Sequence, residues 1–189
     1  MEKQKFISRL NWRLIVIHLL ATILLSLGAR RLAALSDIEL IEVLSKYNGN
    51  GMESLATKSE TVGERIYFFL LKISLSYLIA GLVSFVISFI ICRKNKIFWF
   101  NSLLVLVLMF IISKSQILNS NAVKTISDAP GTLFDSFGLY YSYLVNGIVP
   151  VIAGLILFFN PWTKRMIRKQ YPEEHFAPEK VLVADSMKE

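Results

Sequence analysis

Four long stretches of this sequence contain no charged residue, and they limit what the chain can fold into more than any other feature. They are residues 14–29, 73–92, 97–113 and 136–163. A helix that spans the hydrocarbon core of a bilayer needs about 20 mainly apolar residues. The second and fourth runs reach that length alone. The other two reach it if the flanking Arg and Lys side chains extend their charged ends to the interface.

These runs predict an all-α, polytopic integral membrane protein with four transmembrane helices, near residues 12–34, 66–92, 97–118 and 139–159. Buried helices of a soluble bundle are the alternative, but such helices show a polar face, and stretches such as LVSFVISFII and SLLVLVLMFII show none. Composition agrees, because only 19% of the residues are charged, whereas soluble domains have about a quarter.

The first run is also compatible with a cleaved signal peptide, because a basic segment precedes it. However, Arg30 and Arg31 follow its apolar core, and no small-residue cleavage site leads to a clear mature start. We therefore interpret the run as a helix that stays in the protein.

Charge distribution predicts that both termini are cytoplasmic. With that orientation, the inner segments 1–13, 93–96 and 164–189 carry the whole net charge of +7, and the rest of the chain is balanced. This is the asymmetry that the positive-inside rule requires. The aromatic residues agree, because Trp and Tyr concentrate at membrane interfaces. The inner set is Trp12, Trp99 and Trp162, and the outer set is Tyr67, Tyr140, Tyr141 and Tyr143.

We expect the chain to be a multi-pass protein of a cell membrane, most simply a bacterial inner membrane. Its expected partners are the lipid bilayer and other membrane protein subunits or further copies of itself. Nucleic acid is not an expected partner, since that would call for a basic face on a soluble module.

The predicted organisation is a four-helix transmembrane domain over residues 1–160, followed by a basic juxtamembrane segment and flexible cytoplasmic tail over 161–189. An amphipathic helix is expected in the first outer loop at 36–47, because Ser36 and Glu39 have capping-box spacing. In the second outer loop, the SDAPG sequence at 127–131 indicates a turn.

Asn160 and Pro161 suit the cap and first position of a further helix after the fourth span. That short segment is basic and amphipathic, and each of its charges near anionic lipid is worth about 1 kcal/mol. We expect it to anchor the topology or to contact the inner leaflet through Lys164, Arg165, Arg168 and Lys169.

Small and polar residues recur every four positions in the first two spans, and residues four apart share one helix face. Small residues on such a row let two helix backbones come close. We therefore expect these rows to pack the first two spans as an antiparallel hairpin. The packing residues are Thr22 and Ser26 in the first helix and Ser76, Ala80, Ser84 and Ser88 in the second.

Polar residues within a span are costly and need partners. Arg30 and Lys72 both lie toward the outer end of the predicted hairpin. Either they snorkel and pair locally with Glu64, or they bind a lipid phosphate or an anionic solute. His18 lies deeper, where a hydrogen-bonded packing role is favoured over a proton relay.

In the fourth span, Asn146, Pro150 and Gly154 are spaced by four. Proline removes a backbone hydrogen bond and crowds the preceding turn, so a kink is expected. A kinked helix with a nearby amide either lines a cavity or serves as a shaped packing element, and we favour packing.

No catalytic site is expected. None of the four apolar cores contains Asp or Glu, and the sequence lacks the common hydrolase and nucleotide-binding motifs. One cysteine and two histidines leave little for a metal site, and no cofactor is implied.

Three functions remain. The favoured one is a non-catalytic subunit or accessory scaffold of a larger membrane complex. The alternative is a small oligomeric transporter or channel for an anionic or neutral solute, and a lipid-modifying enzyme or its regulator comes third.

Overall fold

The computed structural model describes residues 10–46, 60–115 and 117–168, and every regular element in these ranges is helical. The all-α prediction is therefore confirmed for this part of the chain. The NGNG sequence at 48–51, the tail from residue 169 and the first nine residues lie outside it.

Three helices are long and apolar enough to cross a membrane: α2 (Trp12–Ala34), α5 (Glu60–Lys94) and α8 (Leu139–Phe159). The first and last match the predicted spans, whereas α5 begins six residues earlier than expected. The chain thus has the helices of a multi-pass membrane protein.

The third predicted span, 97–118, is a shorter apolar helix of 15 residues, α6 (Phe100–Lys114). It ends at Lys114 and Ser115, and the chain then forms the single turn η2 (Ile117–Asn119). Serines near this end donate to carbonyls of their own helix, Ser113 to Phe110 and Ser115 to Ile112. Hydropathy alone extended the helix past this polar stop.

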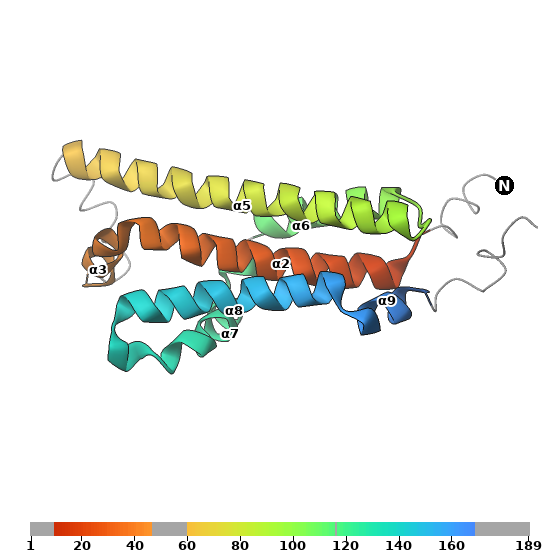
Figure 1. The fold of residues 1–189 in the computed structure, drawn as a ribbon. Helices are drawn as coiled ribbons and strands as arrows, with labels where there is room; N and C mark the ends of the chain where they lie inside the picture. The colour runs from red at the N-terminus through yellow and green to blue at the C-terminus, as the bar shows by residue number, and fades with distance from the viewer. Residues whose placement is uncertain (1–9, 47–59, 116, 169–189) are drawn as a thin grey trace, which may run out of the picture.

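Helix α2 occupies the centre of the bundle, with α5 on one side and α8 on the other (Figure 1). It packs most extensively against α8, then against α5 and α6. Its N-cap is Asn11, whose side chain accepts a hydrogen bond from the amide of Leu14. The helix that sequence analysis interprets as retained is thus the one that the other helices surround.

Glycines bring α2 and α8 into close contact. A Cβ added to Gly28 would lie 2.5 Å from the carbonyl oxygen of Gly147, and one added to Gly154 would lie 2.9 Å from that of Ala21. These separations leave no room for a side chain, so the two backbones touch at both levels. Sequence analysis assigned small-residue packing to the first two spans and missed this contact.

The predicted outer-loop helix at 36–47 is α3 (Ile38–Lys46), joined to α2 through the single turn η1 (Leu35–Asp37). The predicted cap is wrong: Ser36 lies inside η1, and Asp37 accepts from the amide of Leu40 at 3.3 Å. Because η1 continues α2 without an extended residue, the capping position falls one residue later than expected.

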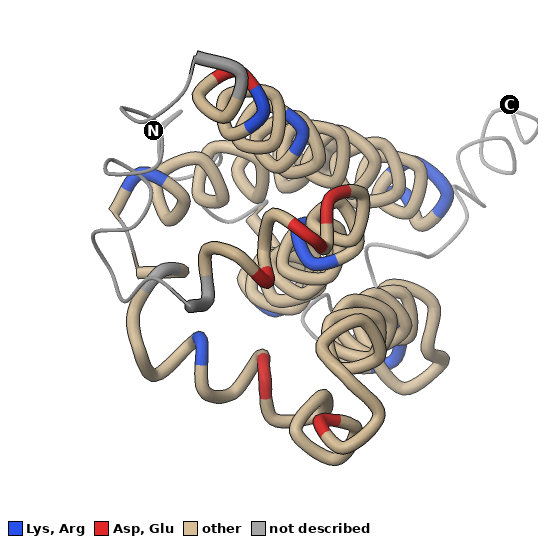
Figure 2. Tube along the Cα trace, turned by 90° about the vertical axis from the view of Figure 1, so that its left-hand side faces the viewer, with Lys and Arg blue, Asp and Glu red and all other residues tan. Residues whose placement is uncertain are grey.

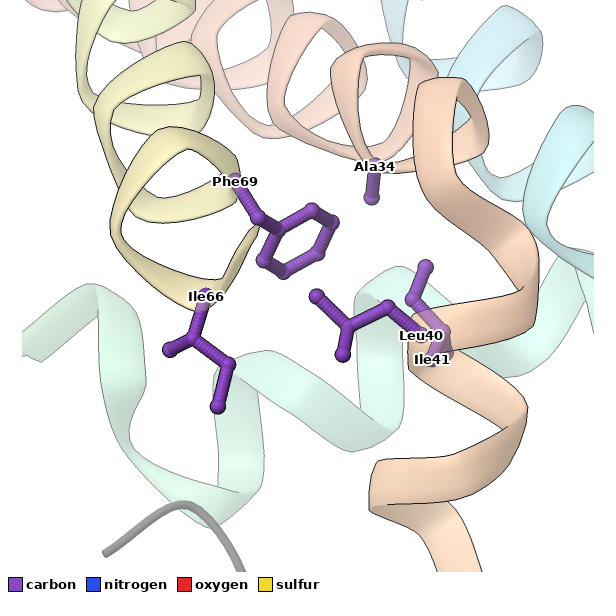
Figure 3. Packing of buried hydrophobic residues seen from close by; sticks show 5 residues of the cluster. All are labelled: Ala34, Leu40, Ile41, Ile66 and Phe69. Atoms are coloured by element: carbon purple, nitrogen blue, oxygen red, sulfur yellow. The ribbon is translucent and has the colours of Figure 1, made fainter. Parts of the chain in front are cut away.

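Apolar side chains dock α3 onto the long helices. Figure 3 shows Leu40 and Ile41 of α3 facing Ala34 of α2 and, from α5, Ile66 and Phe69. All five are buried. The helix therefore caps the bundle through its apolar stripe.

The predicted turn at 127–131 is wrong as well, because these residues lie in α7 (Asn121–Thr132). Ser120 caps this helix, and Pro130 lies in its last turn, where a proline cannot donate the backbone hydrogen bond to the Ile126 carbonyl. Helix α7 packs against α8, and the turn η3 (Asp135–Phe137) with Gly138 at φ 106° joins the two.

The two ends of the bundle differ in charge. Figure 2 looks onto the end that carries α3, and all of the acidic residues in the described ranges belong to the elements near that end: Asp37, Glu39, Glu42, Glu60, Glu64, Asp128 and Asp135. The opposite end is completed by α9 (Pro161–Arg168). In the described ranges, all of the charged residues at that end are basic: Arg13, Arg93, Lys94, Lys96, Lys164, Arg165 and Arg168.

We predict that Gly28→Ala lowers the free energy of unfolding by about 1–3 kcal/mol, because the added methyl group meets the α8 backbone. Gly81→Ala in α5 is the matched control. Its Cβ would have no neighbour within 4 Å, and alanine favours the helix by about 1 kcal/mol.

The measurement is reversible unfolding of the purified chain in detergent, followed by tryptophan fluorescence. Equal stability of the two variants would show that α2 and α8 do not meet as described.

Candidate functional site

His18 lies buried among α2, α5 and α8. Its Nδ1 is 2.7 Å from the hydroxyl oxygen of Ser88 and shares a hydrogen bond with it. The Phe158 ring of α8 lies 4.9 Å away between centroids. Among the described residues, the other ring nitrogen, Nε2, has no hydrogen-bond partner. The histidine therefore joins three helices, which is the packing role that sequence analysis favoured.

The other predicted ridge residues lie along the same interior to different depths. Thr22 and Ser26 of α2 are buried, and the Thr22 hydroxyl donates to the His18 carbonyl at 2.7 Å. Within α5, Ser84 and Ala80 are buried, whereas Ser76 is half-buried. Of the row residues, only Ser76, the one nearest the α3 end of α5, is partly exposed.

A hub of asparagines at the α9 end was missed from the sequence. The Asn11 amide donates to Oδ1 of Asn101 at 2.9 Å, and its side chain donates to the Ile167 carbonyl at 3.0 Å. These bonds connect the start of α2 with the start of α6 and with α9. An asparagine directly before an apolar run is typical of an N-cap, so the sequence could have predicted the role of Asn11 but not its bonds to Asn101 and Ile167.

Helix α9 begins as predicted, since the Trp162 amide donates to Oδ1 of Asn160 at 2.8 Å. Buried Ile167 and Thr163 fix one of its faces to the bundle, while Lys164 and Arg165 are exposed. Arg168 ends the helix, and Lys169 lies outside the described residues. The exposed basic side chains are on the face that turns away from the bundle.

Asn146 holds α7 against α8. Its Oδ1 accepts a hydrogen bond from the Gly131 amide at 2.6 Å, directly after Pro130. A Cβ at position 131 would collide with this side chain, so only glycine fits. Pro150, one turn later, is buried, and α8 continues through it as one helix. Both residues therefore serve helix packing in this structure.

Arg31 forms an ion pair at the outer end of α2. Its guanidinium group bonds to Asp128 of α7 and stacks over the Tyr143 ring of α8, 5.0 Å from the centroid. These residues come from three helices, and no local sequence signal connects them. Together with Asn146, this cluster fixes the position of α7.

Arg30 and Lys72, which sequence analysis placed near one anion, have different neighbours in the structure. Lys72 lies 3.4 Å from the Ser36 hydroxyl, on the side of α5 that meets η1. Nearby, Nε of Arg65 donates to Asp37 at 2.8 Å and its Nη2 bonds to Glu39 at 3.2 Å. These polar bonds hold the η1–α3 segment on α5.

Arg30 lines a cleft of about 620 Å³ between α5 and α6, together with Lys114 at the end of α6. The ammonium group of Lys114 lies over the Phe110 ring at 5.7 Å. The walls are otherwise apolar or weakly polar, and no described Asp or Glu lines the cleft. The lining residues are Ile73, Ser74, Tyr77, Leu78, Gly81, Leu82, Leu106, Met109, Phe110, Ser113 and Leu118.

This cleft is a candidate ligand site. It combines apolar walls with two cations, which suits a ligand with an apolar body and an anionic end. Metal binding is not indicated there, because the described residues contain no group of three or more His, Cys, Asp or Glu that could hold an ion.

Comparison with family models, with curated proteins and with solved structures finds no match for this chain.

Proposed function

We propose that this chain is a non-catalytic subunit or accessory scaffold of a larger membrane assembly. The observation that supports this proposal is that polar side chains inside the helices form hydrogen bonds within the bundle. His18 bonds to Ser88, Asn101 to Asn11, and Asn146 to Gly131. Each bond joins two elements of the bundle. Polar groups within a membrane mark function when they face a pathway, whereas these hold the fold together.

The proposal includes four crossings of the bilayer with both ends on the cytoplasmic side, in a bacterial inner membrane. The third crossing is made by α6 and α7 in two pieces. Two observations support it. Asn11 bonds tie the start of α6 to the start of α2, and Arg31 ties α7 to the far end of α2. The purely basic described residues at the α9 end then face the cytoplasm.

Cysteine labelling tests this topology in a Cys92→Ser background. We expect an impermeant maleimide to label Asp135→Cys on intact cells, and to label Lys94→Cys and Arg165→Cys only after permeabilisation. All three native side chains are exposed in the structure. Labelling of Lys94→Cys and Asp135→Cys from the same side would mean that residues 100–132 enter and leave by one surface, and would overturn four crossings.

A small oligomeric transporter or channel for an anionic or neutral solute is the second candidate. The cleft favours it, because Arg30 and Lys114 offer positive charge among apolar walls. However, the described cores of α2, α5, α6 and α8 contain no Asp or Glu, and proton-coupled transport commonly uses such groups.

Purification in mild detergent separates the two candidates. A subunit should elute with other membrane proteins at one fixed stoichiometry, and the isolated chain should show no anion flux in liposomes. If the chain elutes alone and its liposomes pass chloride or phosphate, with the flux lost in Lys114→Gln and kept in Lys124→Gln, the transporter is correct and the scaffold proposal fails. Lys124 is an exposed cation on α7, outside the cleft.

A further inference from the structure

We propose that the cleft between α5 and α6 binds one anionic phospholipid from the leaflet on the α3 side. Arg30 and Lys114 hold the phosphate, and the apolar walls hold part of an acyl chain. This inference rests on the membrane placement proposed above.

The short length of α6 creates the site. Its 15 residues extend about 22 Å, whereas the hydrocarbon core is about 30 Å thick. Because α6 starts at the α9 end beside Asn11, it stops about 8 Å short of the opposite surface. Helix α5 continues over 35 residues, so on the side that lines the cleft it extends beyond the end of α6. A lipid is the molecule that fills such a gap in a bilayer.

The depth of both cations agrees with this geometry. Arg30 lies about 27 Å along α2 from Trp12, the tryptophan at the inner interface. Its backbone is therefore about 3 Å inside the outer boundary of the hydrocarbon core, and its side chain can extend from there to the outer phosphates. Lys114 starts lower, and its long side chain can extend toward the same level. With no described acid in the lining, both cations favour an anionic headgroup over a zwitterionic one, and each is worth about 1 kcal/mol near anionic lipid.

The part of the cleft farther from the outer end of α5 is lined by apolar residues, as a site for an acyl chain requires. Leu82 and Leu106 face it from α5 and α6, and Gly81 leaves its wall open, since a Cβ there would meet nothing within 4 Å. Tyr77 and Ser74, nearer the outer end of α5, add hydroxyl groups to the lining. A free anion would use the cations but leave these walls uncovered.

Native mass spectrometry of the full chain tests the proposal, with titrations of phosphatidylglycerol and of phosphatidylcholine that carry the same acyl chains. The wild-type chain should bind one phosphatidylglycerol molecule, with higher affinity than phosphatidylcholine. Lys114→Gln should weaken that binding about fivefold, the factor that corresponds to about 1 kcal/mol, and leave phosphatidylcholine unchanged. Lys124→Gln is its control and should change neither affinity.

Gly81→Phe should fill the cleft and weaken the binding of both lipids. Val86→Phe should leave the binding of both unchanged, because Val86 is exposed on α5 outside the cleft. If Gly81→Phe fails to fold, Lys114→Gln still decides the question. Inorganic phosphate should not displace the lipid. Displacement, or equal phosphatidylglycerol affinity in wild type and Lys114→Gln, would overturn the proposal.

A failure here is distinguishable from a failure of the proposed function. Lipid affinity depends on the cleft variants alone, whereas the maleimide labelling pattern reports the crossings and the co-purification reports the scaffold role.

Discussion

Every other long helix of this protein packs against α2, and the glycines at the α2–α8 contact decide how close the neighbours come. In a bilayer, helix association cannot use the hydrophobic effect, because lipid tails are as apolar as leucine. Close packing of backbones and buried hydrogen bonds have to supply the attraction instead. Gly28, Gly147 and Gly154 allow the first, and the His18–Ser88 bond adds the second on the α5 side.

Contacts with α8 and α2 hold α7 in place beyond the break that follows α6. In the break itself, the Ser115 hydroxyl donates to the Ile112 carbonyl, and the Ser120 amide donates to the Ile117 carbonyl at 3.1 Å. Asn146 accepts from the amide after Pro130, and Arg31 pairs with Asp128. These partners come from α8 and α2, the two helices in closest contact. The same break leaves α6 short and thereby opens the cleft that contains Arg30 and Lys114.

Sequence reasoning predicted the limits of α2 and α8 because charges or turn residues flank both apolar runs. It did not predict where α6 ends, since hydropathy measures the transfer of side chains into an apolar phase and does not detect where backbone hydrogen bonding stops. Lys114, Ser113 and Ser115 mark the end of the helix in the sequence. Lys72 does not line the cleft that contains Arg30; the direction of a side chain around a helix depends on packing, which spacing alone does not give. The position of Asn11 directly before an apolar run could have predicted its role as an N-cap. The Arg31–Asp128 pair could not be predicted, because the two residues are 97 positions apart in the sequence.

The central claim is that hydrocarbon surrounds the exposed apolar face of this bundle. Spin labels on α5 in a Cys92→Ser background test it most directly, at Tyr67, Leu75, Ile79 and Val83, all exposed in the structure. Reconstituted in liposomes, Ile79 and Val83 should collide often with oxygen and rarely with a water-soluble nickel chelate, and Tyr67 should show the reverse. If the chelate reaches Ile79 and Val83 as readily as Tyr67, water surrounds α5 and the account is wrong.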